Sequence, residues 1–215
     1  MVELDPAQVR SALRRLAVAQ PNVFGADGHH FKLNPPLSET EVITFEHNHS
    51  VSLHRDYRRF VTQISNGGTG PYYGIFPLGQ MDGTRHTFQP WRERDGLVGI
   101  LAEPFPLRDA WNDLSGMPTD DLLRTDEGEY TRKMEAFDKK YWDPSRMNGA
   151  MPICHKGCAL RVWLVITGPE SGHLWEDGRA DYTGLFPLLL KDGSRATFSS
   201  WYGEWLVDAL QMALA

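Results

Sequence analysis

The sequence predicts an α+β fold: a single domain spanning residues 1–215, with a mainly antiparallel sheet, helices packed on one side of it, and helical N- and C-termini. Two observations predict this class. Amphipathic repeats with helix-capping residues occur near both ends of the chain. Between them, a run of branched and aromatic residues at 159–167 is followed by a short loop and a second apolar run, which is typical of a hairpin of strands.

The first helix is predicted by Asp5-Pro6, which supplies a capping acceptor and a proline in the first turn, followed by apolar residues at i, i+4 and i+7. Pro21 ends this helix, so residues 1–36 are expected to form a helix and a loop. The tetrapeptide Ser38-Glu39-Thr40-Glu41 resembles a capping box and introduces a short helix through Phe45.

A further helix carries an apolar stripe over residues 53–64, with Tyr57 near its start. The tripeptide Asn66-Gly67-Gly68 follows directly. Asparagine and glycine tolerate a left-handed backbone, so Asn66 and Gly67 are predicted to cap this helix at its C-terminus. The aromatic segment 72–78 that comes next is predicted to be a strand.

The later elements are predicted from similar signals. Aromatic residues and a methionine repeat at helical spacing over 127–141, and Thr197 or Ser199 begins a final helix with Trp201 on its apolar face. The clearest strand signal is 159–167, joined by a five-residue connection to a partner strand at 173–177. Segments 97–101 and 185–190 are weaker strand candidates, and 103–126 is expected to be acidic and rich in turns.

Residues 74–91 match residues 184–201 without gaps at a constant offset of 110. The match hints at a duplication. Because a strand, an Asp-Gly turn and a capped element form a common layout and the flanking segments differ, we favour independent origins for the two copies.

The chain has 28 Asp and Glu against 22 Lys and Arg, a net charge of −6. This balance argues against a nucleic-acid binder, whose affinity comes from clustered cations. It suits solubility, which is the more common reason for an acidic surface, and it also suits a basic protein partner. No leader-like N-terminus and no apolar run of membrane-spanning length occur, and two cysteines fit a reducing compartment. The sequence therefore predicts a cytoplasmic protein with no membrane segment.

Metal chemistry is suggested most by Cys154, His155 and Cys158, with His173 across the expected hairpin. Structural zinc needs four ligands, usually two close pairs, and no second pair exists. We favour two reduced cysteines at the start of a strand, with Gly157 easing a bend, and predict no metal or cofactor. No nucleophile elbow and no phosphate-binding glycine loop occurs either, so the chain is predicted not to be an enzyme.

A partner-binding surface is predicted near the hairpin, where aromatic side chains stand among carboxylates. Its expected members are Glu170, Trp175, Glu176, Asp177, Asp181 and Tyr182. A second acidic stretch, 120–129, could add to this surface, but such a stretch is more often simply a solvated loop.

Three segments resemble the SUKH superfamily, the Smi/Knr-type domain of bacterial immunity proteins and fungal cell-wall regulators. The first is Leu53-His54-Arg55-Asp56-Tyr57-Arg58-Arg59-Phe60 with Asn66-Gly67-Gly68, the second is 71–78, and the third runs from 152 through 177 to the 198–206 region. His54 stands where the family usually has proline. The signature positions are then Tyr57, Asn66, Gly67, Gly68, Gly157 and Trp201, and 79–150 is an insert longer than a minimal family domain.

The resemblance implies a SUKH-like α+β domain without catalysis that binds a protein partner, in bacteria often a nuclease toxin that it neutralises. An acidic binder suits such a basic target, because charge complementarity speeds encounter. A regulatory scaffold remains open as an alternative. A metal-dependent hydrolase built on Cys154, Cys158, His155 and His173 is the third reading.

Overall fold

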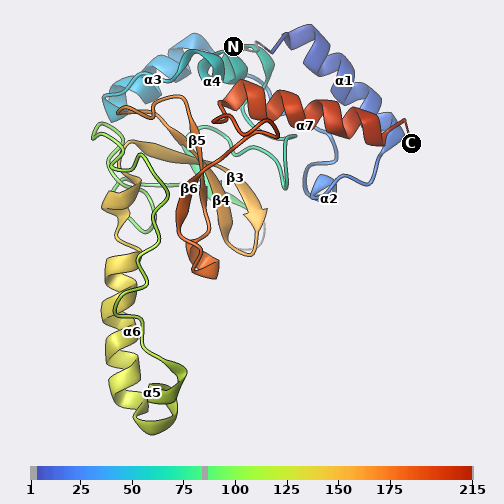
Figure 1. Ribbon diagram of the computed structural model, residues 1–215. Coiled ribbons are helices and arrows are strands. Elements are labelled where there is room, and N and C mark those ends of the chain that lie inside the picture. Colours follow the sequence, from blue (N-terminus) through green and yellow to red (C-terminus); the bar gives the residue numbers. More distant parts are fainter. Residues whose placement is uncertain (1–3, 84–86, 215) are drawn as a thin grey trace.

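The computed structural model describes residues 4–83 and 87–214 and has the predicted α+β class (Figure 1). The helices are α1 (Pro6–Ala19), α2 (Ala26–His29), α3 (Glu39–His49), α4 (Arg55–Arg59), the π-helix η1 (Phe60–Ile64), α5 (Asp120–Thr125), α6 (Glu127–Tyr141), the 3₁₀ turns η3 (Pro144–Met147) and η4 (Arg179–Asp181), and α7 (Phe198–Met212). The strands are β1 (Gln80–Asp82), β2 (Phe88–Pro90), β3 (Ala150–Gly157), β4 (Leu160–Val165), β5 (Leu174–Asp177) and β6 (Leu185–Pro187).

The main sheet is antiparallel with the order β3-β4-β5-β6, and β1 pairs with β2 in a separate two-stranded sheet. The predicted hairpin is therefore present, with Trp163 opposite Trp175 in its register. Five consecutive residues of β4, from Arg161 to Val165, are buried, so both faces of this strand are covered. A strand buried on both faces reads as a continuous apolar run rather than an alternating one.

Helices α1, α3, α4 and α7 gather along one side of the sheet (Figure 1). Helix α7 packs against α4 and η1 through Phe198, whose ring centroid lies 5.0 Å from that of Tyr57 and 4.8 Å from that of Phe60. The predicted signature residue Trp201 is 6% exposed. In the described part of the chain, no helix has the length and apolarity needed to cross a lipid bilayer.

The predicted caps were right for three helices. Asp5 accepts from the amide of Gln8, Ser38 and Glu41 form the capping box, and Thr197 caps α7. The predicted cap at Asn66 and Gly67 was wrong, because the π-helix ends at Ile64 and its C-cap Ser65 is extended.

Gly67 and Gly68 do have positive φ angles, of 81° and 95°, but for a different reason. Here three chain segments meet: Gly68 bridges to Leu33 on one side and to Ile75 on the other. A Cβ at Gly68 would lie 2.6 Å from the carbonyl oxygen of Lys32, so only glycine permits this approach. Asn66 accepts a hydrogen bond from the amide of Leu78 at 2.7 Å, which fixes the crossing.

Two strand predictions were wrong, and three strands were missed: β1, β2 and β3. Segment 72–78 forms no continuous strand and meets β3 only at separate points, a bridge of Ile75 to Cys154 and amide hydrogen bonds from Tyr73 and Phe76. Segment 97–101 forms no strand. Strand β3, which contains Cys154 to Gly157, was predicted only as a strand start. It turns into β4 through Cys158 and Ala159, which both have positive φ angles, of 49° and 63°.

The two similar segments adopt different structures after their Asp-Gly turns. Phe88 begins strand β2, whereas the equivalent Phe198 begins helix α7. Residues 84–86 of the first copy lie outside the described residues. This divergence fits independent origins better than duplication.

Candidate functional site

Two members of the predicted partner-binding surface lie in the core, so their assignment was wrong. The Trp175 side chain is fully buried and packs edge-on against Phe105, with ring centroids 4.9 Å apart. Asp177 is 3% exposed and bonds Arg179 twice, to Nε at 2.9 Å and to Nη2 at 2.7 Å. The segment containing Phe105 covers the face of β5 that the sequence suggested was open.

Two further residues of the predicted partner-binding surface form ion pairs with basic side chains of the same chain. Glu170 pairs with Arg195 at 2.5 Å, and Glu176 pairs with Lys156. Burial disfavours the charged form of Lys156, but the hydrogen bond and charge of Glu176 outweigh it and raise the pKa of Lys156. Both carboxylates are therefore already neutralised locally.

Asp181 and Tyr182 are exposed and lie at the root of a projecting arm. The arm comprises residues 112–143, and its helices α5 and α6 extend away from the sheet and the other helices (Figure 1). Its predicted helix, 127–141, coincides with α6. The ring of Tyr182 lies 6.3 Å from Phe137 and 6.2 Å from Tyr141, so the exposed residues of the predicted surface border this arm.

Aromatic packing fixes the arm at its root. Trp111 lies 5.3 Å from Tyr141, and the guanidinium of Arg146 sits 3.9 Å above the Trp111 ring. The Tyr141 hydroxyl donates to Asn112 at 2.8 Å, and Trp111 bridges to Leu185 at the edge of the sheet. These contacts make the arm an extension of the sheet edge rather than a free tail.

The arm tip, residues 119–130, is exposed to solvent, unlike the packed root of the arm. None of the residues of α5 is buried, and Leu123 is 44% exposed. Five carboxylates occur in the tip against Arg124 alone: Asp120, Asp121, Asp126, Glu127 and Glu129. Asp126 caps α6 by accepting from the amide of Glu129 at 2.9 Å. The tip therefore combines negative charge, an exposed leucine and a fixed position far from the core.

The four candidate metal ligands are not brought together. Cys154 is buried, with Sγ 3.3 Å from the carbonyl oxygen of Pro71, and burial raises the pKa of its thiol. Cys158 is exposed in the β3–β4 turn, and His173 lies near Glu170. Among the described residues, no three His, Cys, Asp or Glu side chains are grouped as metal ligands.

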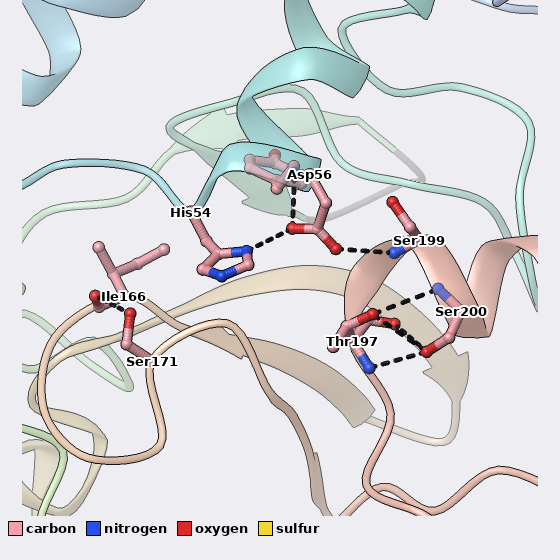
Figure 2. Close-up of polar contacts among 8 residues, drawn as sticks. His54, Asp56, Ile166, Ser171, Thr197, Ser199 and Ser200 are labelled. Atoms are coloured by element: carbon pink, nitrogen blue, oxygen red, sulfur yellow. Dashed lines mark hydrogen bonds and ion pairs between the residues drawn. The ribbon is translucent and has the colours of Figure 1, made fainter. Parts of the chain in front are cut away.

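A histidine, a carboxylate and three serines lie close together where the starts of α4 and α7 meet the loop after β4 (Figure 2). His54 Nδ1 lies 2.7 Å from Asp56 Oδ1, and Asp56 also accepts from the amides of Tyr57 at 2.7 Å and Ser199 at 3.0 Å. Asp56 thus caps the starts of two helices at once. This contact was not predicted from the sequence, although an Asp in the first turn of α4 is a signal for it.

Two of the three serines, Ser171 and Ser200, use their hydroxyls in other bonds, and Ser199 contributes its backbone amide. Ser171 donates to the carbonyl of Ile166 at 2.7 Å, and Ser200 forms the capping box of α7 with Thr197 (Figure 2). The His54 ring packs on Gly172, where a Cβ would lie 2.7 Å from it. The geometry is that of a helix-capping network.

Comparison with known proteins gives no family: no protein-family model, no curated protein and no solved structure matches this chain.

Proposed function

We propose that this chain is a non-enzymatic protein-binding domain that acts as an immunity protein and neutralises a basic, nuclease-type toxin by covering its active site. The proposal rests on the likeness of the 53–68, 71–78 and 152–206 segments to SUKH domains, together with the excess of acidic residues. A basic cleft that binds phosphates is attracted to and filled by a carboxylate-rich surface.

The arm tip is the observation that carries this proposal. Isolated helices as short as α5 and α6 are marginal in water, and the tip buries little surface of its own. A projecting element whose apolar and acidic side chains face solvent is suited to gain contacts from a partner. Asp181 and Tyr182 are exposed at the root of the same arm.

Co-expression tests the proposal. Each protein encoded beside this chain is expressed alone and together with it, and cell growth and co-purification are measured. We expect one neighbour to arrest growth when alone, to be tolerated with this chain, and to co-purify with it. A toxic neighbour that neither binds nor is tolerated would contradict the proposal.

The same experiment distinguishes the alternatives. A neighbour that co-purifies but is harmless alone would favour a regulatory scaffold. Stoichiometric zinc in the purified protein, measured by elemental analysis, would favour the hydrolase instead.

A further inference from the structure

A surface hollow of about 600 Å³ lies between the loop after α1 and Tyr73. Helix α2, which belongs to this loop, lies on the opposite side of the molecule from the arm (Figure 1). The loop 20–31 forms most of its wall, with α2 inside it. Phe24, Asp27 and Tyr73 line this hollow. From the sequence, residues 20–36 were predicted only to form a loop.

Two aromatic rings face this hollow and remain open to solvent. Phe24 is 62% exposed and Tyr73 is 39% exposed, which is unusual for neighbouring large rings. Their centroids are 5.5 Å apart and their planes meet at 65°, so they form a corner rather than a stack. Such a corner offers π faces to a single bound group.

A carboxylate lines the same hollow. Asp27 is exposed and forms no ion pair with a Lys or Arg of the described residues. Aromatic faces attract cations, and a nearby carboxylate adds a full opposite charge. Rings and carboxylate together select a positively charged group with an apolar stem.

The backbone holds these groups in place without a ligand. Gly25 has a φ of 79°, and a Cβ there would lie 2.1 Å from the carbonyl oxygen of Tyr72, so the loop is pressed against the aromatic segment. On its other side, the Tyr73 ring lies 5.6 Å from the His155 ring. His30 and Phe31 are also left-handed, which is uncommon for residues other than glycine. A preformed site loses less entropy on binding.

We propose that this hollow binds a monovalent organic cation, an ammonium or guanidinium group seated against Phe24 and Tyr73 with Asp27 as its counter-charge. The source is either a lysine or arginine side chain or a small free ammonium compound. This site is independent of the arm and of the immunity function.

NMR titration of the intact protein at pH 7.5 tests the proposal. The probes are N-acetyl-lysine amide, N-acetyl-arginine amide and tetramethylammonium, with N-acetyl-norleucine amide as the neutral match. We expect at least one cation to shift the resonances of Phe24, Asp27 and Tyr73 in the millimolar range, at least about threefold more tightly than norleucine amide. Whichever cation binds best identifies the source.

Variants make the test specific. Phe24→Leu and Asp27→Asn each should weaken cation binding by about threefold or more, whereas Phe88→Leu, which alters another exposed phenylalanine, should leave it unchanged. Because Phe24 and Asp27 are exposed, these variants should fold normally. No binding by any cation, or equal binding by norleucine amide, would overturn the proposal.

Discussion

At the residue scale, the Asp56 carboxylate connects elements that are far apart in sequence. It accepts hydrogen bonds from the amides of Tyr57 and Ser199, at the starts of α4 and α7. Helix starts carry unsatisfied amides and a positive partial charge, so an anion there is stabilising. One side chain thus aligns two helices that pack through the Phe198 ring.

Replacing Asp56 with Ala should lower the free energy of unfolding by roughly 2–4 kcal/mol, because two caps are lost together. Urea unfolding followed by tryptophan fluorescence measures this. Asp121→Ala is the matched control, since its side chain is 89% exposed and pairs only with Arg124. An equal loss in both variants would contradict the double-cap role of Asp56.

His29 is a second residue with a defined energetic effect. Its ring is buried, Nδ1 accepts from the amide of Phe31 at 3.1 Å, and Nε2 has no partner among the described residues. Burial lowers the pKa of His29 from 6.5 to about 4, because the desolvated ring resists protonation. The folded protein therefore keeps this histidine neutral in mildly acidic solution.

Between pH 6.5 and 4 the unfolded chain binds a proton at His29 that the folded chain does not. Stability therefore falls as the pH falls through this window, by about 3 kcal/mol in full. His29→Asn should flatten the dependence of the unfolding free energy on pH in urea titrations at several pH values. The exposed neighbour His30→Asn should keep it, and an unchanged slope in His29→Asn would refute the assignment.

At the element scale, the β3–β4 turn is built from residues ill suited to it. Cys158 and Ala159 both adopt the left-handed conformation, which a two-residue hairpin turn of this kind demands and which Asn-Gly adopts most readily. The double variant Cys158→Asn, Ala159→Gly should therefore raise stability by about 1 kcal/mol. Thermal unfolding checks this, and Ala159→Val, which is β-branched, should instead lower the melting temperature.

Elements with local signals were predictable and elements made by long-range contacts were not. Helices α1, α3, α6 and α7 were predicted from caps and periodicity, which act within a few residues. The region after the π-helix depends on Gly68 meeting Leu33 and Ile75 at once, so its structure is set by distant segments. The aromatic segment at 72–78 had strand composition but no continuous partner.

The candidate site, too, was predictable where its signals are local in the sequence and not where it depends on long-range packing. Acidic residues at 120–129 were visible in the sequence, but their position on a projecting arm follows from the packing of Trp111, Tyr141 and Tyr182 at its root. The burial of Trp175 could not be predicted, because the segment that covers it, around Phe105, has no periodicity. The hollow at Phe24 and Tyr73 likewise joins two loops distant in sequence.

At the scale of the whole molecule, charge is distributed unevenly. The net charge is −6, and the arm tip alone has five carboxylates against one arginine. Two of the five pair with cations of the arm, Asp121 with Arg124 and Glu129 with Arg132 and Lys133. The other three, Asp120, Asp126 and Glu127, form no ion pair among the described residues, whereas carboxylates of the body such as Glu170 pair with cations. The negative electrostatic potential is thus concentrated at the end of the arm. It attracts an approaching basic protein and orients it toward the tip.

This distribution predicts how association with a toxin identified by co-expression depends on charge placement. Neutralising the tip with Asp120→Asn, Asp121→Asn and Glu127→Gln should slow association by about tenfold at low salt, because steering is lost. Neutralising three exposed carboxylates outside the tip, with Asp95→Asn, Asp109→Asn and Glu135→Gln, changes the net charge equally and should slow it much less. Surface plasmon resonance measures both rates, and added salt should erase the difference since exposed charges are screened. Equal slowing by the two triple variants would mean that net charge, and not the arm tip, guides the partner.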